Sequence, residues 1–175
     1  MMINIERCII LLLLLLSLSS NAQMSQKYLQ ATTGFNRIGF FNEAGFKIGI
    51  KNNQFKLGLR HYTLDNFFEK NTVGLSMDYY YQLFSKDNKY YFYPGISTVF
   101  FMENKTNAQV FNYDYKLING VGVNLNVNWS LFYQIGFGIT TTRAHLLNST
   151  DVTKVDYFNY ELGLGVSYRF NKSKK

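Results

Sequence analysis

The stretch that most constrains the fold is the last regular segment of the chain, residues 157–170, which alternates between apolar and polar side chains. Its two faces are Tyr160, Leu162, Leu164, Val166, Tyr168, Phe170 and Asn159, Glu161, Gly163, Gly165, Ser167, Arg169. A period of two residues predicts a β-strand. Because one face is unbroken and apolar while the other carries glycines and charges, the apolar face is expected to point outward into lipid.

The start of the chain predicts a secretory signal peptide over residues 1–22. A short segment with one acidic and one basic residue precedes the apolar block Ile9 to Leu16, and small polar residues lead to Asn21-Ala22. The apolar block is too short to span a bilayer as a helix. Residues 23–175 are then enough for one domain. The single cysteine, Cys8, lies in the predicted signal, so the mature chain would hold no disulfide and no thiolate site.

The rest of the chain divides into eight segments long enough to cross a bilayer as tilted strands, which need roughly 9–11 residues each. They are 28–40, 43–51, 54–64, 72–84, 89–102, 114–126, 129–141 and 156–170. Connections 52–53, 85–88 and 127–129 are short, whereas 65–71, 103–113 and 142–155 are longer and polar; the first outer connection, near Phe41-Asn42, is an exception. An even strand number with this alternation predicts a closed antiparallel barrel with both termini in the periplasm.

The inward face of these strands is predicted to hold glycines and charges. Ten of the 13 glycines share it: Gly45, Gly49, Gly58, Gly74, Gly120, Gly122, Gly136, Gly138, Gly163 and Gly165. A narrow barrel needs this room. The inward charges are Lys47, Lys56, Arg60, Lys116 and Arg169 against Asp78 and Glu161. Such charges must be paired or hydrated, which indicates either a plug of ion pairs or a polar path, and a lumen filled with side chains favours the plug.

The spacing also predicts particular neighbours. A two-residue turn at Asn52-Asn53 would place Lys47 opposite Gly58, Gly49 opposite Lys56 and Gly45 opposite Arg60. A symmetric connection over 65–71 would bring Arg60 diagonally across from Asp78, so an Arg60–Asp78 ion pair is expected. Pro94 cannot donate a ladder hydrogen bond, so a bulge or an early break is expected in that strand.

Taken together, the signal peptide, the eight strands, the alternating connections and a final strand closing on Tyr168 and Phe170 resemble the small eight-stranded outer-membrane β-barrel family of Gram-negative bacteria. The resemblance covers the whole mature chain and implies an all-β, antiparallel up-and-down transmembrane barrel, 23–175, in the bacterial outer membrane. It also implies contact with outer-membrane lipid and lipopolysaccharide, and recognition of the last strand by the barrel insertion machinery. Asn171 to Lys175 follow Phe170, whereas family members often end on the aromatic residue.

One local pattern has catalytic character. His61 and Thr63 are expected to share the lipid-facing side of the third strand near its outer end. They resemble the His-x-Ser motif of the outer-membrane lipid A deacylase family, with His61 as base and Thr63 in place of the nucleophilic serine. Glu69 is the nearest candidate for the acid that such a mechanism requires. The alternative interpretation is a histidine and a threonine at the rim of the barrel.

Other classes are disfavoured by the sequence. The net charge is +7, but the basic residues are spread along the chain and form no stripe that would indicate nucleic acid. His61 and His145 lie far apart, so no metal site is expected, and no cofactor motif is present. A secreted barrel that binds an apolar ligand would need an apolar interior. The sequence therefore predicts a non-enzymatic outer-membrane barrel with a structural or surface-interaction role, without identifying a surface partner.

Overall fold

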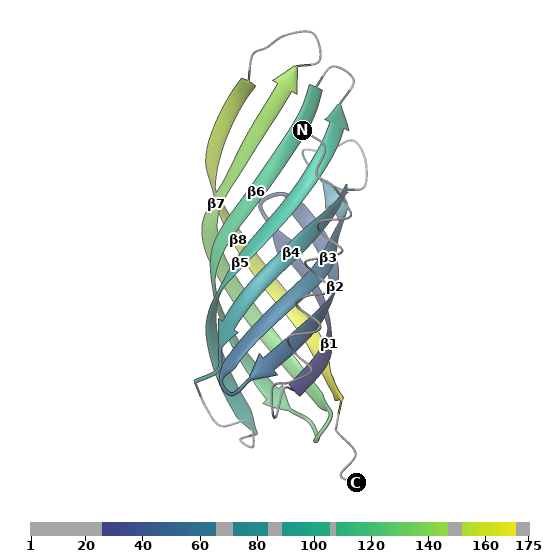
Figure 1. The fold of residues 1–175 in the computed structure, drawn as a ribbon, viewed down its shortest axis with the longest axis vertical. Coiled ribbons are helices and arrows are strands. Elements are labelled where there is room, and N and C mark those ends of the chain that lie inside the picture. Colours follow the sequence, from purple (N-terminus) through teal and green to yellow (C-terminus); the bar gives the residue numbers. More distant parts are fainter. Residues whose placement is uncertain (1–25, 66–71, 84–88, 106–107, 147–151, 171–175) are drawn as a thin grey trace.

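The computed structural model describes residues 26–65, 72–83, 89–105, 108–146 and 152–170, and they form one closed antiparallel barrel of eight strands (Figure 1). Each strand pairs with the next along the chain, and the last pairs with the first. The strands are β1 Gln26–Asn36, β2 Gly39–Ile50, β3 Asn53–Asp65, β4 Thr72–Tyr81, β5 Tyr90–Lys105, β6 Ala108–Asn124, β7 Trp129–Leu146 and β8 Val152–Phe170. The predicted up-and-down barrel is confirmed, while the predicted signal peptide lies outside the described residues. None of the described residues forms a helix that is long and apolar enough to span a membrane.

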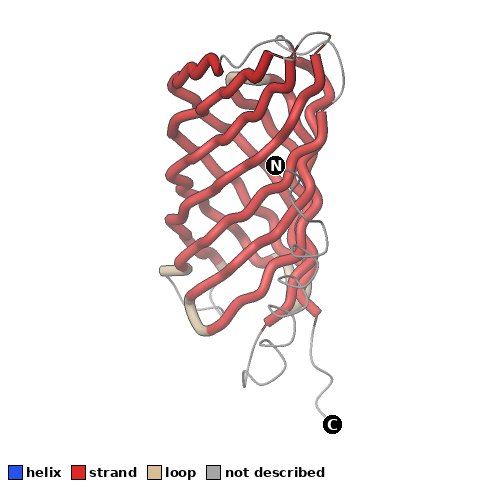
Figure 2. The backbone as a smooth tube through the Cα atoms, turned by 45° about the horizontal axis from the view of Figure 1, so that its top comes forward, coloured by secondary structure: helices blue, strands red, loops and turns tan. Residues whose placement is uncertain are grey.

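The strands run obliquely around the barrel axis (Figure 2), and their side chains alternate between outside and inside as predicted. The outer wall is apolar: Leu117 is 66% exposed, Leu59 61% and Phe158 58%. The inward positions hold the predicted glycines, of which Gly138 is half-buried and the others are buried. An apolar outside around a polar inside is the pattern of a barrel that faces lipid.

Two of the predicted outer loops are largely strand. β5 to β8 have 16, 17, 18 and 19 residues, whereas β1 to β4 have 11, 12, 13 and 10. The predicted loops 103–113 and 142–155 are occupied by the β5–β6 and β7–β8 hairpins, which rise above the rest of the wall (Figure 1). The polar side chains of these segments mark where the wall becomes polar and not where the strands end, because backbone pairing continues regardless of side-chain polarity.

The first two hairpins turn one or more residues earlier than predicted. β1 ends at Asn36, and its side-chain Oδ1 accepts hydrogen bonds from the Ile38 and Gly39 amides at 2.9 and 3.1 Å, so the chain turns there and not near Phe41-Asn42. The second turn is Lys51-Asn52, with Ile50 opposite Asn53.

That shift of the second turn changes every predicted pair between β2 and β3. Lys47 lies opposite Lys56 and not Gly58, and Gly45 lies opposite Gly58 and not Arg60. Inward and outward positions are nevertheless unchanged, because moving the turn by one residue moves each pairing by two.

β5 does not break at Pro94. The strand continues through it, with Pro94 opposite Asn119 of β6. On its other side β5 pairs with β4, and that ladder stops at the residue next to Pro94, Gly95, which lies opposite Tyr80. The missing amide donor of proline therefore lies just past the end of the β4–β5 ladder, where a strand tolerates it.

The barrel interior is layered. One aromatic cluster, near the rim away from the start of β1 and the end of β8, consists of Ile38, Phe41, Tyr62, Val99 and Phe101. A second, on the side where β1 begins and β8 ends, consists of Tyr80, Tyr91, Tyr93, Ile118 and Phe132. In the second cluster the rings of Tyr93, Tyr91 and Phe132 pack directly against Gly120, Gly122 and Gly165. Several glycines thus make room for aromatic rings, and not only for the long cations as the sequence suggested. Buried charges fill the space between the two clusters.

Candidate functional site: the interior ion-pair network

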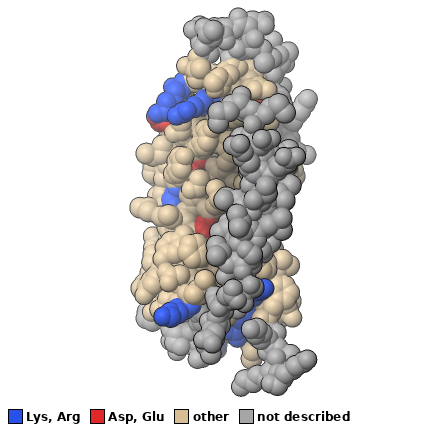
Figure 3. Space-filling model, in the orientation of Figure 1, with Lys and Arg blue, Asp and Glu red and all other residues tan. Residues whose placement is uncertain are grey.

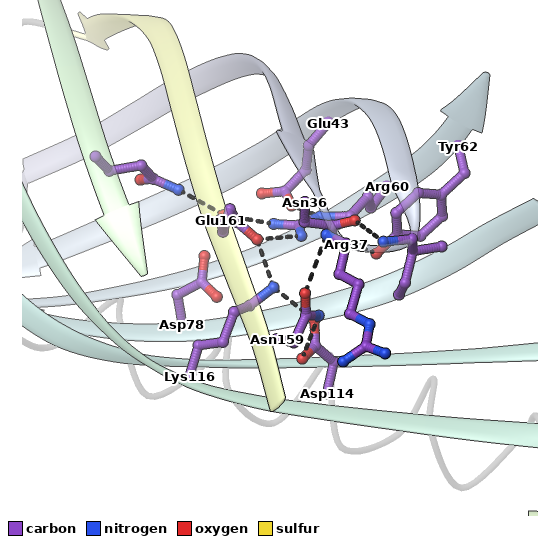
Figure 4. A network of polar contacts seen from close by, with 12 residues as sticks. Asn36, Arg37, Glu43, Arg60, Tyr62, Asp78, Asp114, Lys116, Asn159 and Glu161 are labelled. Carbon is purple, nitrogen blue, oxygen red and sulfur yellow. Dashed lines mark hydrogen bonds and ion pairs between the residues drawn. The ribbon is translucent and has the colours of Figure 1, made fainter. Parts of the chain in front are cut away.

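The charged layer is a continuous chain of alternating acids and bases. In order it runs Asp78 (β4), Lys56 (β3), Glu43 (β2), Arg60 (β3), Glu161 (β8), Lys116 (β6) and Asp114 (β6). Figure 4 shows the part of this chain around Arg60, Glu161 and Lys116. All seven side chains occupy inward positions and are at most 1% exposed. The alternation of side chains along each strand therefore places these charges inside the barrel, and closure of the barrel brings them together.

Each cation of this chain bridges two carboxylates. Lys56 Nζ contacts Glu43 Oε1 and lies 2.5 Å from Asp78 Oδ2. Lys116 Nζ lies 2.5 Å from both Asp114 Oδ2 and Glu161 Oε2. Pairing on both sides is what a desolvated ammonium requires, because an unpaired charge in this interior would be costly.

Arg60 is the centre of the chain. Its Nε donates to Glu43 Oε2 at 2.6 Å, and its Nη1 and Nη2 donate to Glu161 Oε2 and Oε1 at 2.6 and 3.3 Å. Its guanidinium also stacks on the Phe41 ring, 4.0 Å from the ring centroid. Its planar fork of fixed donors binds Glu161 through two nitrogens while a third nitrogen binds Glu43, a two-pronged contact that the single ammonium of a lysine cannot make.

Neutral side chains donate to further oxygens of Glu161 and Asp114, whereas the buried Asp78 Oδ1 has no hydrogen-bond partner among the described residues. Gln134 Nε2 donates to Glu161 Oε1 at 3.0 Å. Thr140 Oγ1 and Asn159 Nδ2 donate to Asp114 Oδ1 at 3.0 and 3.1 Å. The network thus ties β2, β3, β4, β6, β7 and β8 together across the barrel.

The structure joins five of the predicted interior charges and separates two. Lys56, Arg60, Asp78, Lys116 and Glu161 belong to the network. Lys47 and Arg169 lie elsewhere, on either side of Tyr28, near the end of the barrel where β1 begins and β8 ends. The predicted Arg60–Asp78 ion pair is wrong: Arg60 lies opposite Gly74, and Asp78 pairs with Lys56.

Sequence reasoning missed Glu43 and Asp114. Both stood at the first residue of a predicted strand and were therefore not counted as interior. β2 begins four residues earlier and β6 six residues earlier, which places both side chains well inside the barrel. The available signal was their spacing: Glu43 is four residues from Lys47, and Asp114 is two residues from Lys116. An even spacing along a strand places both side chains on the same, inward face.

The candidate catalytic residues lie on the outer wall, apart from this network. His61 is half-buried opposite Asn42, and Thr63 is exposed. A register shift opposite Phe40 and Phe41 leaves Thr63 without a partner on β2, so it sits in a β-bulge. Glu69 lies outside the described residues, and none of the described side chains forms a hydrogen bond or an ion pair with His61. Within the described ranges, no group of three or more His, Cys, Asp or Glu is arranged to hold a metal ion.

Comparison with known proteins shows the fold. No family model and no curated protein sequence matches the chain. Among solved structures, the N-terminal β-barrel domain of Pseudomonas aeruginosa OprF is similar, with 13% identity, a TM-score of 0.52, and coverage of 83% of this chain and 97% of that domain. A major outer membrane protein from Thermus thermophilus is similar with 17% identity, a TM-score of 0.52, and coverage of 85% of this chain and 100% of that protein. The chain therefore has the fold of the small eight-stranded outer-membrane β-barrels.

Proposed function

We propose that the protein is a non-enzymatic component of the bacterial outer membrane, with a structural or surface-interaction role and an interior closed by the ion-pair network. The observation that carries the proposal is the contrast between its two surfaces. The wall of the barrel is apolar and exposed. Inside it, a layer of fully buried, mutually paired charges lies between two aromatic clusters. A wall of this kind suits lipid, and an interior filled in this way leaves no continuous path for ions.

The partners follow from the same surfaces. Outer-membrane lipid and lipopolysaccharide would surround the apolar wall. The insertion machinery would recognise β8, which ends on the exposed aromatic Phe170 and, beside it, the Trp129–Tyr168 ring pair. The tall β5–β8 wall offers the surface for any partner outside the cell, whose identity this proposal leaves open.

Closure can be tested by electrical recording. The refolded mature protein in a planar lipid bilayer should give no steady conductance steps, because each cation of the network is held by two carboxylates. Reproducible steps from the unmodified protein would contradict a plugged barrel. Membrane insertion is checked on the same sample by heat-modifiable mobility in detergent gels, which a barrel that resists unfolding at room temperature should show.

Location and orientation need a separate test in cells. The protein should fractionate with the outer membrane, and recovery as a soluble periplasmic protein would contradict the proposal. Single cysteines at Asn52 and Gln109, both exposed and at opposite ends of the barrel, test the orientation. With the termini in the periplasm, a membrane-impermeant thiol reagent should label the Gln109→Cys variant in intact cells. The Asn52→Cys variant should be labelled only after the outer membrane is opened.

A further inference from the structure

The end of the barrel at which β1 begins and β8 ends, called here the terminal mouth, contains a small polar pocket. It is lined by Tyr28, Lys47, Gln54, Gln82, Tyr91, Asn124, Asn126, Val127, Asn128, Trp129, Ser130 and Arg169. The aromatic cluster of Tyr80, Tyr91, Tyr93, Ile118 and Phe132 lies between this pocket and the ion-pair network. The pocket therefore belongs to the mouth and is distinct from the charged layer described above.

Two cations enter this pocket from either side of one tyrosine. Tyr28 lies directly opposite Lys47 on β2 and directly opposite Arg169 on β8. Adjacent strands are roughly 4.8 Å apart, so the backbones of Lys47 and Arg169 are separated by about 10 Å on the same inward face. Lys47 Nζ lies 4.6 Å from the centroid of the Tyr28 ring, so its charge is directed over that ring. Both charges thus border one small space.

The chemistry of the lining favours an anion. Its charged groups are Lys47 and Arg169, and none of the described lining residues is an aspartate or a glutamate. Gln54, Gln82, Ser130 and the asparagines make the rest of the lining largely polar, with Gln54 Nε2 donating to Gln82 Oε1 and Asn128 Nδ2 to the Arg169 carbonyl. Lysine and arginine form their strongest hydrogen bonds to carboxylate and phosphate oxygens. A bound cation would be repelled, and a neutral ligand would gain little from the two positive charges.

The position of Lys47 directs its charge to the pocket. Lys47 lies opposite Lys56 in the β2–β3 ladder and is only 7% exposed. Lys56 turns towards Glu43 and Asp78 in the network, whereas Lys47 turns towards Tyr28 and the pocket. The charge of Lys47 therefore borders the pocket and not the charged layer.

The rim around the pocket is also basic. Lys27, Lys51 and Lys89 are exposed at this end of the barrel, and Figure 3 shows basic side chains in its lower part and no described acidic one there. A concentration of one sign of charge around an opening raises the local concentration of oppositely charged ligands. The volume of the pocket that the centre of a water-sized sphere can occupy is about 30 Å³. This is two to three times the roughly 10–15 Å³ that one water needs. A small group fits, and a bulky one does not.

We infer that the terminal mouth is a binding site for a small oxyanion, a carboxylate or a phosphate group, with Lys47 and Arg169 as its charged ligands. The site faces the periplasm if the termini do, and the inference does not depend on the role proposed for the outer surface. It assigns a function to the two interior cations that lie outside the ion-pair network.

Phosphate binding to the refolded mature protein in a nonionic maltoside detergent tests the site. Titration followed by ³¹P NMR should show saturable binding of inorganic phosphate. The dissociation constant should rise at least roughly tenfold in Lys47→Met and in Arg169→Gln, since each variant removes one charge-assisted contact. Acetate should displace phosphate if the site takes oxyanions in general, and its failure to do so would assign the site to phosphate groups. Each variant is used only if it keeps heat-modifiable mobility, and either one suffices.

The matched control is Lys89→Gln, which removes a cation from the same end of the barrel but not from the pocket. Its dissociation constant should stay within about twofold of the parent value, because an exposed charge is screened by solvent. If Lys89→Gln lost as much phosphate binding as the pocket variants, general attraction by the basic rim would explain the binding, and the inference would be overturned. So would the absence of saturable phosphate binding by the parent protein, or equal displacement by chloride at the same ionic strength.

Discussion

Arg60 and Glu161 are 101 residues apart in the sequence and form a two-pronged ion pair across the interior of the barrel, between β3 and β8, which are not neighbouring strands. Glu161 also accepts from Lys116 and Gln134. The loss of its charge would therefore affect two buried cations and one neutral donor. The pair links opposite sides of the wall in a way that no backbone ladder does.

We expect Glu161→Gln to lower the free energy of unfolding by about 3–5 kcal/mol. The substitution preserves the shape of the side chain but leaves Arg60 and Lys116 with one carboxylate each in a desolvated interior. Urea unfolding in lipid vesicles, followed by the fluorescence of Trp129, the single tryptophan, measures the change.

The control for this prediction is Asp156→Asn. Asp156 pairs with Lys154 at 2.9 Å, but the two side chains are 46% and 53% exposed. Exposed pairs contribute little because solvent screens them. The unfolding midpoint of Asp156→Asn should match that of the parent, and equal effects of the two substitutions would show that burial does not set the strength of these pairs.

Gly138 should tolerate no side chain. A Cβ at this position would collide with the Tyr115 carbonyl oxygen and lie 2.7 Å from Lys116 Cα, and both are backbone atoms held in the β6–β7 ladder. Gly138→Ala is expected to cost about 1–3 kcal/mol of stability, since the strand must shift. At Gly49 the nearest atom would be a Tyr28 ring carbon at 3.4 Å, an ordinary contact, so Gly49→Ala should stay within about 0.5 kcal/mol. The same urea assay compares the two, and equal losses would refute the close approach at Gly138.

Lys51 occupies the first position of the β2–β3 turn with φ 53°, in the left-handed region. This conformation costs roughly 1–2 kcal/mol for most residues, while asparagine adopts it more readily. Lys51→Asn should therefore raise the unfolding midpoint, and Lys51→Val, with a branched Cβ, should lower it. The two variants remove the same charge, so the loss of the lysine charge does not account for a difference between them. Identical midpoints would contradict the strain.

The sequence was sufficient for the architecture because the information is periodic. Alternation assigns each residue to the inside or the outside, and that assignment is insensitive to register: Lys47 and Lys56 are inward although the turn between them was misplaced by one residue. The individual contacts depend on register, so the predictions of those contacts were wrong. Arg60 was expected beside Asp78, but the β3–β4 ladder places Gly74 opposite Arg60, and Glu43 and Glu161 pair with its guanidinium.

Strand ends were the other source of error. Glu43 and Asp114 were missed because the polar residues ahead of them predict loops, although pairing continues through such residues, most clearly in the tall β5–β8 wall. The bulge at Thr63 likewise could not be predicted, since nothing in the local sequence distinguishes it from regular alternation. Contacts that cross the lumen, such as Arg60 to Glu161, require closure of the barrel and its stagger, which no single segment encodes.

The last prediction concerns the outer-wall alternative, a lipid A deacylase that uses His61 and Thr63. Such an enzyme needs a nucleophile within hydrogen-bond reach of its base and an acid that orients the base. Among the described residues no carboxylate contacts His61, no hydrogen bond joins it to Thr63, and the bulge takes Thr63 out of the regular ladder. We therefore expect the lipid A acyl pattern, measured by mass spectrometry, to be the same in cells that express the parent, His61→Ala, Thr63→Ala or no barrel. Glu69→Gln extends the test to the acid that lies outside the described residues. An acyl chain that disappears with the parent protein and is restored by both His61→Ala and Thr63→Ala would replace the structural role with the enzyme.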